Sequence, residues 1–240
     1  MANENIVLIA GKSATGKSLS LRNIKDPEGV IYLNTESNKS LPFPAKFRQY
    51  TVLDPMQVYG AFEKAEEKDD VHTIIIDSLT FLMAMYESMY VINSSNGLKA
   101  WGSYAEYFKN LMQKYIAASS KNVILTAHTS DVLNESEMVM ETLVKIKGSI
   151  MNQGIESFFT TVIGSKKVPL KKLEGFNNPL LTITEEEEII GIKYVFQTKL
   201  TKETVNERIR APLGLWDRQH TYIDNDVQNV LDHIHNYYQA

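Results

Sequence analysis

A glycine-containing stretch near the N-terminus constrains this chain more than any other feature. Residues 11–18 read GKSATGKS, which is the complete G-x-x-x-x-G-K-[ST] pattern of a phosphate-binding loop. In such a loop, backbone N–H groups surround a phosphate chain, and the glycines let the backbone turn tightly beside it. The pattern predicts a helix directly after the loop, because a helix N-terminus also attracts anions.

The residues on both sides of the loop fit this context. Residues 6–10 form a continuous apolar run, which is typical of a strand buried in a parallel sheet. Within the loop, Lys17 is predicted to reach the β- and γ-phosphate oxygens of a nucleotide, and Ser18 to bind Mg²⁺. Three apolar residues follow at roughly helical spacing, namely Leu19, Leu21 and Ile24. The candidate nucleotide-binding residues are Gly11, Lys12, Ser13, Ala14, Thr15, Gly16, Lys17 and Ser18.

A second apolar run ends in a carboxylate. Residues 73–76 read TIII and are followed by Asp77 and Ser78. The run predicts an interior parallel strand, with Asp77 at its carboxyl end in the Walker B arrangement that holds Mg²⁺ directly or through water. The same pattern also describes a helix N-cap. Downstream of a complete phosphate-binding loop, it favours the metal-binding interpretation.

Two further predicted strands also end in polar residues. Residues 30–33 lead into Glu36, and residues 122–127 lead into His128. Because parallel strands end at one edge of a sheet, both side chains are expected near Asp77. Glu36 is a candidate general base for a water that attacks the γ-phosphate; the alternative is a solvated loop glutamate. His128 is a candidate γ-phosphate sensor, and the alternative is a capping or core histidine.

The later segments carry weaker signals. Residues 130–147 are predicted to form a mobile loop, followed by a helix at 149–159. Residues 165–191 predict a β-hairpin or inserted strands, and a long strand at 189–198 has residues 205–210 as a candidate hairpin partner. Four lysines in this region form a solvated edge or, alternatively, a DNA-binding surface: Lys166, Lys167, Lys171 and Lys172.

Composition and length exclude several classes of protein. The 240 residues contain no cysteine, which excludes disulfides and thiolate metal sites. The formal net charge of −4 means that the overall field does not favour nucleic acid. No apolar run approaches the length of a membrane span, and the N-terminus lacks the basic region of a signal peptide, so we expect a cytoplasmic protein without membrane contact. No spacing among the C-terminal histidines demands a metal: His220, His233 and His235.

The domain organisation follows from this length. We expect one domain over residues 1–240, with a β-rich extension at 165–215 and a C-terminal helix within 221–240. The helix is expected from about Asn225, because apolar residues recur on one face from there to Tyr238.

The order of these motifs resembles the RecA-like core of strand-exchange recombinases and replicative helicases. Residues 31–36 (IYLNTE) are similar to the strand that delivers the catalytic glutamate in that family, and residues 74–79 (IIIDSL) to its Walker B motif. The chain is more similar still to phage-encoded RecA-core ATPases, which include the Sak-type single-strand annealing ATPases. This resemblance covers most of residues 5–215. It implies an α/β fold with a mostly parallel sheet flanked by helices and a C-terminal antiparallel β-hairpin region.

The resemblance also implies ligands, partners and residue roles. It implies ATP hydrolysis with Mg²⁺, assembly into a homo-oligomeric ring or filament, and action on single-stranded DNA beside single-strand DNA-binding or replication proteins, in the cytoplasm of a bacterial host. A cation from a neighbouring subunit would contact the γ-phosphate, and Lys199 and Arg210 are favoured over Lys202 and Arg208. The segment that would face DNA, 130–147, departs from the family's pattern because it is acidic.

Two classes of function stay open. The first is a RecA-like ATPase that acts on single-stranded DNA in recombination, annealing or replication. The alternative is an ATP-gated assembly or regulatory protein that acts on protein partners, which the net negative charge favours. A small-molecule kinase is disfavoured by the Asp-Ser Walker B, the β-rich C-terminal half and the absence of an Arg-rich lid. A GTPase is disfavoured because no Asn-Lys-x-Asp or Thr-Lys-x-Asp motif occurs.

Overall fold

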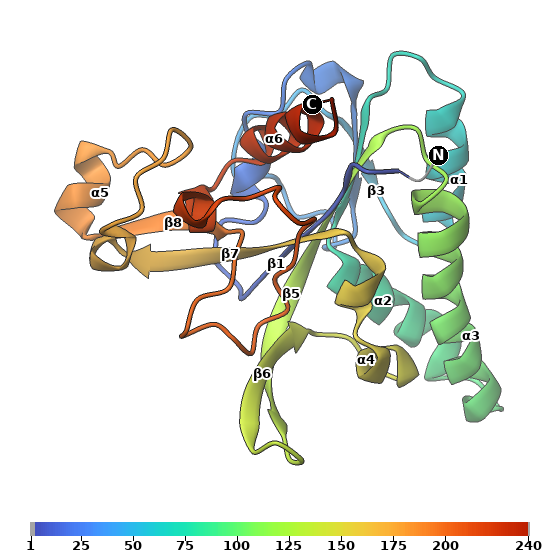
Figure 1. Cartoon of the computed structure of the whole chain (residues 1–240). Coiled ribbons are helices and arrows are strands. Elements are labelled where there is room, and N and C mark those ends of the chain that lie inside the picture. Colours follow the sequence, from blue (N-terminus) through green and yellow to red (C-terminus); the bar gives the residue numbers. More distant parts are fainter. Residues whose placement is uncertain (1–2, 240) are drawn as a thin grey trace.

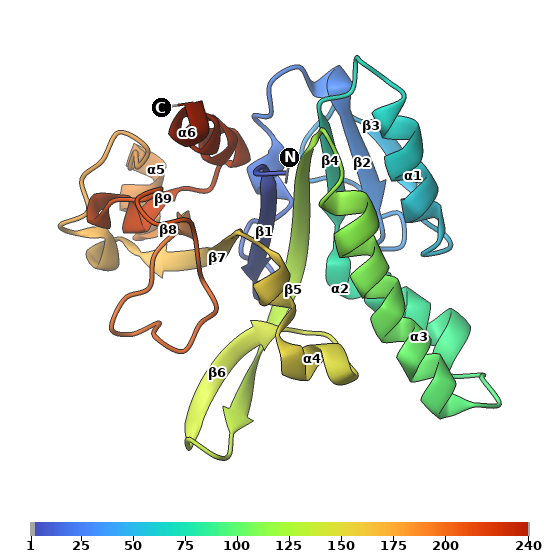
Figure 2. The same ribbon diagram turned by 45° about the vertical axis from the view of Figure 1, so that its right-hand side comes forward.

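A mixed β-sheet runs through the centre of the molecule, with helices on both of its faces (Figures 1 and 2). The computed structural model describes residues 3–239. The strands are β1 (Ile6–Gly11), β2 (Val30–Asn34), β3 (Arg48–Thr51), β4 (Thr73–Asp77), β5 (Asn122–Asn134), β6 (Val139–Val144), β7 (Thr161–Pro169), β8 (Ile192–Gln197) and β9 (Tyr222–Asp224). Within the described residues, these nine strands form a sheet in the order β3-β2-β4-β5-β1-β7-β8-β9, and β6 pairs with β5.

The helices are of uneven length. The α-helices are α1 (Gln57–Glu66), α2 (Leu79–Tyr86), α3 (Gly97–Asn110), α4 (Ser149–Gln153), α5 (Glu185–Ile190) and α6 (Val227–Gln239). Short π-helical turns continue α2 (Glu87–Val91) and α3 (Leu111–Ile116), and the 3-10 turns are Leu19–Leu21, Pro27–Gly29, Ile155–Phe158, Leu170–Leu173 and Arg218–Thr221. No helix in the described part of the chain is both long and apolar enough to cross a bilayer.

Parallel pairing dominates the centre of the sheet. The pairs β3–β2, β2–β4, β4–β5, β5–β1 and β1–β7 are parallel, whereas β5–β6, β7–β8 and β8–β9 are antiparallel. Every residue of β1, β2 and β4 is buried, which explains why these strands read as continuous apolar runs. The structure confirms the predicted α/β class, with a mostly parallel sheet and antiparallel strands near the C-terminus.

The two faces of the sheet carry separate cores. On one face, Leu8 and Ile76 pack with the helices that include Phe62 of α1 and Phe108 of α3. On the other, neighbouring strand residues pack against α6 and the segment around Trp216. Figure 1 shows α6 and α3 on opposite sides of the sheet. Successive residues of each central strand therefore serve different cores, which fixes the strand register.

No α-helix follows the phosphate-binding loop, so that prediction was wrong. Leu19–Leu21 forms a single 3-10 turn instead. Asp26 has a left-handed φ of 46°, and Pro27 begins another 3-10 turn before β2. Proline cannot continue a helix that precedes it, so the chain has no room for further helical turns here. The loop therefore relies on its own N–H groups more than on a helix dipole.

The segment predicted as a mobile loop is a β-hairpin. Strand β5 continues past the sheet to Asn134 and pairs with β6 from Thr129–Val144 to Asn134–Val139. Figure 2 shows this hairpin as a projection away from the rest of the sheet. The predicted helix at 149–159 is α4 followed by a 3-10 turn, because Gly154 interrupts it with a φ of 71°.

The C-terminal segments pair differently from the prediction. Strands β7 and β8 are antiparallel neighbours, but a long excursion containing α5 joins them instead of a tight turn. The acidic run at 185–188 forms the first turn of α5, where Thr184 and Glu187 make a capping box and the helix dipole favours acids. Residues 205–210 do not pair with β8, because Arg210 forms a bridge to Val162 of β7. Residues 222–224 form β9, and α6 begins at Val227.

Candidate nucleotide-binding site

The sheet register brings the predicted strand-tip residues together. Gly11, where β1 enters the phosphate-binding loop, lies beside His128 of β5, and Asn34 of β2 lies beside Asp77 of β4. Strand β5 separates β1 from β4, so the loop and Asp77 face each other across the end of one strand. Glu36 follows β2 by two residues, at the same carboxyl edge where ligands bind in open α/β sheets.

Lys17 is held inside its own loop. Its side chain is only 6% exposed, and Nζ donates hydrogen bonds to the carbonyl oxygens of Gly11 (3.0 Å) and Lys12 (2.8 Å). Burial lowers the pKa of Lys17 to about 8, although the negative charges of Asp77 and Glu36 act to raise it. The Lys17 amine is therefore hydrogen-bonded to two neutral carbonyl oxygens. An anionic phosphate is a stronger acceptor and would replace them.

Among the described residues, the Asp77 carboxylate accepts hydrogen bonds only from hydroxyl groups. Ser18 Oγ (2.7 Å) and Tyr32 OH (2.8 Å) donate to its Oδ2, and Thr126 Oγ1 donates to Oδ1. Asp77 is 2% exposed. Burial raises the pKa of the Tyr32 phenol, and the charge of the neighbouring Asp77 carboxylate raises it further. Sequence reasoning missed Tyr32 and Thr126, although a tyrosine or threonine inside an apolar strand needs a hydroxyl partner.

The donor set suits Mg²⁺. Ser18 and Asp77 present a hydroxyl and a carboxylate oxygen 2.7 Å apart, and Mg²⁺ prefers oxygen ligands of this kind. Within residues 3–239, no group of three or more His, Asp or Glu side chains is arranged to hold a metal ion by itself. An ion at this position would complete its shell with water and substrate phosphate oxygens, which is how Mg²⁺ usually binds.

Glu36 and His128 form a pair at the mouth of the site. His128 Nε2 lies 3.2 Å from Glu36 Oε1, and Lys39 Nζ lies 3.5 Å from Glu36 Oε2. The hydrogen bond from His128 lowers the pKa of Glu36. Partial burial acts to raise this pKa, and the charge of Lys39 lowers it again. The ring of His128 in turn rests against the edge of Phe81, with 5.6 Å between ring centroids. Glu36 is thus ionised and oriented.

These residues line one cavity. It has a volume of about 330 Å³ and is bounded by the loop from Ser13 to Leu19 together with Glu36, Asp77 and His128. Its remaining walls are Tyr32 of β2, residues 39–42 and Tyr194 of β8, none of which the sequence predicted as part of a site. The cavity combines a phosphate cradle with a carboxylate–hydroxyl pair and an oriented Glu–His pair.

Comparison with known families decides the assignment. The sequence model of a family described as an AAA domain matches residues 3–166, which is about two thirds of the chain. The chain belongs to this AAA domain family. The match spans the loop, Glu36, Asp77 and His128, so the assembled site lies inside the part that is characteristic of a P-loop ATPase type of protein. It ends within β7, and β8, β9 and α6 lie beyond it. No curated protein was found to match the chain.

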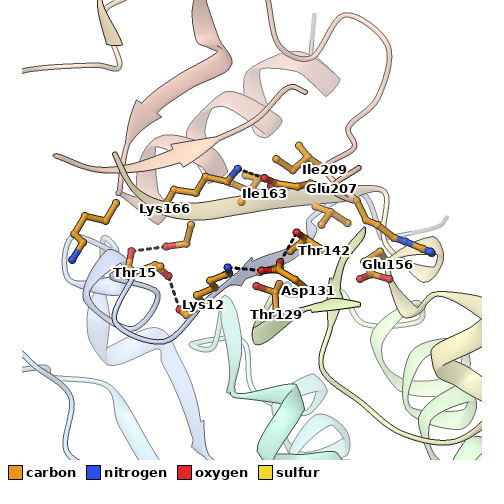
Figure 3. Close-up of a pocket in the computed structure, with 17 residues that line it drawn as sticks. Lys12, Thr15, Thr129, Asp131, Thr142, Glu156, Ile163, Lys166, Glu207 and Ile209 are labelled. Carbon is orange, nitrogen blue, oxygen red and sulfur yellow. Dashed lines mark hydrogen bonds and ion pairs between the residues drawn. The ribbon is translucent and has the colours of Figure 1, made fainter. Parts of the chain in front are cut away.

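A second cavity lies on the other side of the loop of this AAA domain. Its volume is about 280 Å³, and it is lined by β5, β6, β7 and residues 207–209 (Figure 3). Figure 3 shows Lys12 pointing toward Asp131, at 2.6 Å, where Thr142 also donates a hydrogen bond. The side chain of Lys12 therefore ties the loop to the β5–β6 hairpin, and only its backbone is available to a phosphate in the first cavity.

The two predicted trans cations lie outside both cavities of the AAA domain. Lys199 Nζ donates a hydrogen bond to the Trp216 carbonyl oxygen at 3.1 Å. Arg210 is exposed, and its guanidinium makes no hydrogen bond or ion pair with residues 3–239. Neither side chain lines the cavity at the phosphate-binding loop of its own chain. Arg210 is the freer of the two cations.

Proposed function

We propose that this AAA domain protein binds ATP with Mg²⁺ in the cavity beside the phosphate-binding loop and hydrolyses its γ-phosphate. The observation that carries the proposal is the Glu36–His128 pair, 3.2 Å apart, at the mouth of a cavity that also contains Lys17 and Asp77. Phosphate binding alone needs only the loop. An ionised, oriented carboxylate at the adjacent strand tip is what hydrolysis adds to it.

The chain's own side chains can perform the reaction. Lys17 leaves the loop carbonyls and stabilises negative charge on the β- and γ-phosphate oxygens. Glu36 accepts a proton from the attacking water as the water oxygen bonds to phosphorus and the bond from phosphorus to the ADP oxygen breaks. His128 keeps Glu36 ionised before the reaction and stands beside the loop entry, where it can donate a hydrogen bond to a γ-phosphate oxygen.

Ser18 and Asp77 would hold Mg²⁺ in this site. When bound, the ion supplies charge neutralisation for the phosphate oxygens. Hydrogen bonds from Tyr32 and Thr126 fix the orientation of the Asp77 carboxylate. Among residues 3–239, this carboxylate has no cationic hydrogen-bond partner. A buried carboxylate whose only hydrogen-bond partners are hydroxyl groups is suited to bind a cation.

The two lysines of the loop provide a matched test of this proposal. We expect Lys17→Ala to abolish ATP binding measured by calorimetry, whereas Lys12→Ala retains it within a few-fold, because Lys12 faces Asp131 in the other cavity. Phosphate release should follow the same order. Undiminished binding or turnover in Lys17→Ala would overturn the site.

We further propose that the protein forms a homo-oligomeric ring or filament that acts on single-stranded DNA, as in the RecA-like and Sak-type ATPases that the sequence resembles. In this arrangement, Arg210 or Lys199 of one copy reaches the γ-phosphate bound by its neighbour. Three exposed apolar residues at the tip of the β5–β6 hairpin, which grows directly from His128, supply a surface for a partner: Leu133, Met138 and Met140. Single-strand DNA-binding or replication proteins, in the cytoplasm of a bacterial host, complete this proposal.

The acidic character of the same hairpin favours the alternative, an ATP-gated assembly protein that acts on protein partners. Asp131, Glu135, Glu137 and Glu141 lie on or beside the two hairpin strands. The experiment is the ATP turnover of the purified protein with and without single-stranded DNA, with its oligomeric state followed by sedimentation. Stimulation by DNA supports the first proposal. Nucleotide-dependent assembly with no effect of DNA contradicts it and supports the alternative.

A further inference from the structure

Strands β7 and β8 continue past the loop end of β1. Ala10 of β1 pairs with Gly164 of β7, which in turn pairs with Gln197 of β8. Tyr194 pairs with Lys167, three residues further along β7 than Gly164, or roughly 10 Å at the usual strand rise. Figure 1 shows β7 and β8 extending well beyond β1. The extension forms a wall next to the phosphate-binding loop.

The aromatic ring of Tyr194 lies directly against this loop. Its Cδ1 atom is 3.4 Å from the position that a Cβ atom on Gly16 would occupy. The residue is 38% exposed, lines the first cavity, and its hydroxyl makes no hydrogen bond to any residue in the described range. Phe196, two residues on, points to the same face and is fully buried in the core. Tyr194 is therefore an aromatic ring that the core does not use.

Tyr194 and the reactive residues occupy opposite sides of the loop. Glu36 follows β2, Asp77 ends β4 and His128 lies within β5. These strands lie on one side of β1 in the sheet, whereas β8 lies on the other side. A nucleoside triphosphate that directs its γ-phosphate toward Glu36 extends its base away from that side. Beside the hydroxyl groups of Ser13, Thr15 and Ser40, the cavity also has walls that are apolar or aromatic: Leu19, Leu41, Pro42 and Tyr194.

We propose that Tyr194 stacks on the base of the bound nucleoside triphosphate. This inference rests on the proposed function, because it assumes that the triphosphate occupies the loop. Among the described residues, this cavity is lined by no Asn or Gln side chain, and its two carboxylates belong to the Glu36–Asp77 end. Stacking therefore holds the base without reading its edge. Since every base has a π-face, ATP and GTP should bind with affinities within a few-fold of each other.

The test separates base contacts from phosphate contacts. Affinities for ATP and for inorganic tripolyphosphate, which has no base, are measured by calorimetry for wild type, Tyr194→Ala and Tyr194→Phe. We expect Tyr194→Ala to weaken ATP binding roughly 5- to 150-fold, the range for loss of one stacked base, while tripolyphosphate affinity stays within two-fold. Tyr194→Phe should restore ATP binding. An equal loss for both ligands would mean that Tyr194 only supports the loop, and would overturn the inference, as would unchanged ATP binding in Tyr194→Ala.

A fluorescent variant gives a second readout. The indole of Tyr194→Trp should be quenched by ATP and GTP but not by tripolyphosphate, because only the nucleotides place a base against it. Quenching by all three ligands, or by none while ATP binds, contradicts stacking. Failure of the function itself gives a different pattern: wild type then binds neither ATP nor tripolyphosphate, or Lys17→Ala binds both as well as wild type does.

Discussion

The nucleotide-binding edge and the C-terminal β7–β9 region treat buried charge in opposite ways. In the C-terminal region, Lys193 is 5% exposed and is paired with Glu187 at 2.8 Å and Asp224 at 3.0 Å. At the nucleotide-binding edge, Asp77 is buried to a similar degree, but its carboxylate is hydrogen-bonded only to hydroxyl groups among the described residues. Lys17 is buried too, and it donates to neutral carbonyls.

The difference indicates which charges serve the fold and which serve the ligand. Removing one partner of a buried ion pair is strongly destabilising, because the other charge stays buried and unpaired. A buried charge that lacks an ionic partner already carries that cost in the free protein. Asp77 and Lys17 fit the second case: their charges become fully compensated when a cation and a phosphate bind. Substitutions in the two regions should therefore separate stability from activity.

The largest effect is expected from Asp77→Asn. Loss of the carboxylate removes a Mg²⁺ ligand, and ATP turnover should fall by about 10³-fold or more, since metal charge stabilisation contributes several kcal/mol to such reactions. The stability of the free protein, measured by urea unfolding, should stay the same or rise, because an uncompensated buried charge is removed. A large loss of stability without nucleotide would show that Asp77 serves the fold, and would break the comparison.

Lys193→Met should have the opposite profile. It leaves Glu187 and Asp224 without their buried partner, so the free energy of unfolding should decrease by about 3–5 kcal/mol. Turnover per folded molecule should not change. Lys25→Met is the matched control, because Lys25 and Asp232 form an exposed pair whose loss should leave the unfolding midpoint nearly unchanged. Equal effects of the two substitutions would contradict the structural role of Lys193.

The pKa of Lys17 predicts a basic limit to activity. Burial lowers this pKa to about 8, so the free protein progressively loses the ammonium charge as the pH rises through that value. We expect kcat/KM for ATP to decline above about pH 8, by up to tenfold per pH unit, because kcat/KM reports the ionisation of the free enzyme. In Lys17→Arg, any residual activity should lack this decline, since arginine stays charged. A pH profile flat to pH 10 in wild type would contradict the assignment.

A smaller shift is expected at acid pH. The hydrogen bond from His128 lowers the pKa of Glu36, so the carboxylate remains an active base to lower pH than an ordinary glutamate. In His128→Gln, the Glu36 pKa should rise toward its usual value, and the acid limb of the kcat profile should move to higher pH. The full profile of both proteins, recorded at constant ionic strength, measures this shift. An unmoved limb would show that His128 does not act through Glu36.

The strand-tip residues were predictable because the signals that place them are local. Asp77 and His128 lie in apolar strands, while Glu36 and the loop that carries Lys17 and Ser18 follow such strands. Parallel pairing brings these positions to one edge. The structure places all five around one cavity, and their roles in binding and catalysis stay predictions. The hydrogen-bond donors to Asp77, Tyr32 and Thr126, were missed, because a hydroxyl inside an apolar strand does not reveal which partner it contacts.

The C-terminal region was harder to predict because its contacts are distant in sequence. The acidic run at 185–188 begins a helix, which the structure shows through the capping box of Thr184 and Glu187. Tyr194 reads as one more strand residue, and only the β7–β8 register places it beside Gly16. Helical spacing after the loop also failed as a predictor, because the chain turns at Asp26 and Pro27 before a second helical turn can form.

The most direct test of the proposed hydrolytic site is the comparison of ATP binding and phosphate release in Glu36→Gln. The substitution keeps the size and the hydrogen-bonding capacity of the side chain but removes its ability to accept the proton. The proposal predicts ATP affinity within a few-fold of wild type and phosphate release slower by about 10²- to 10⁴-fold, the usual contribution of a positioned general base. Phosphate release at the wild-type rate, with ATP bound normally, would contradict it.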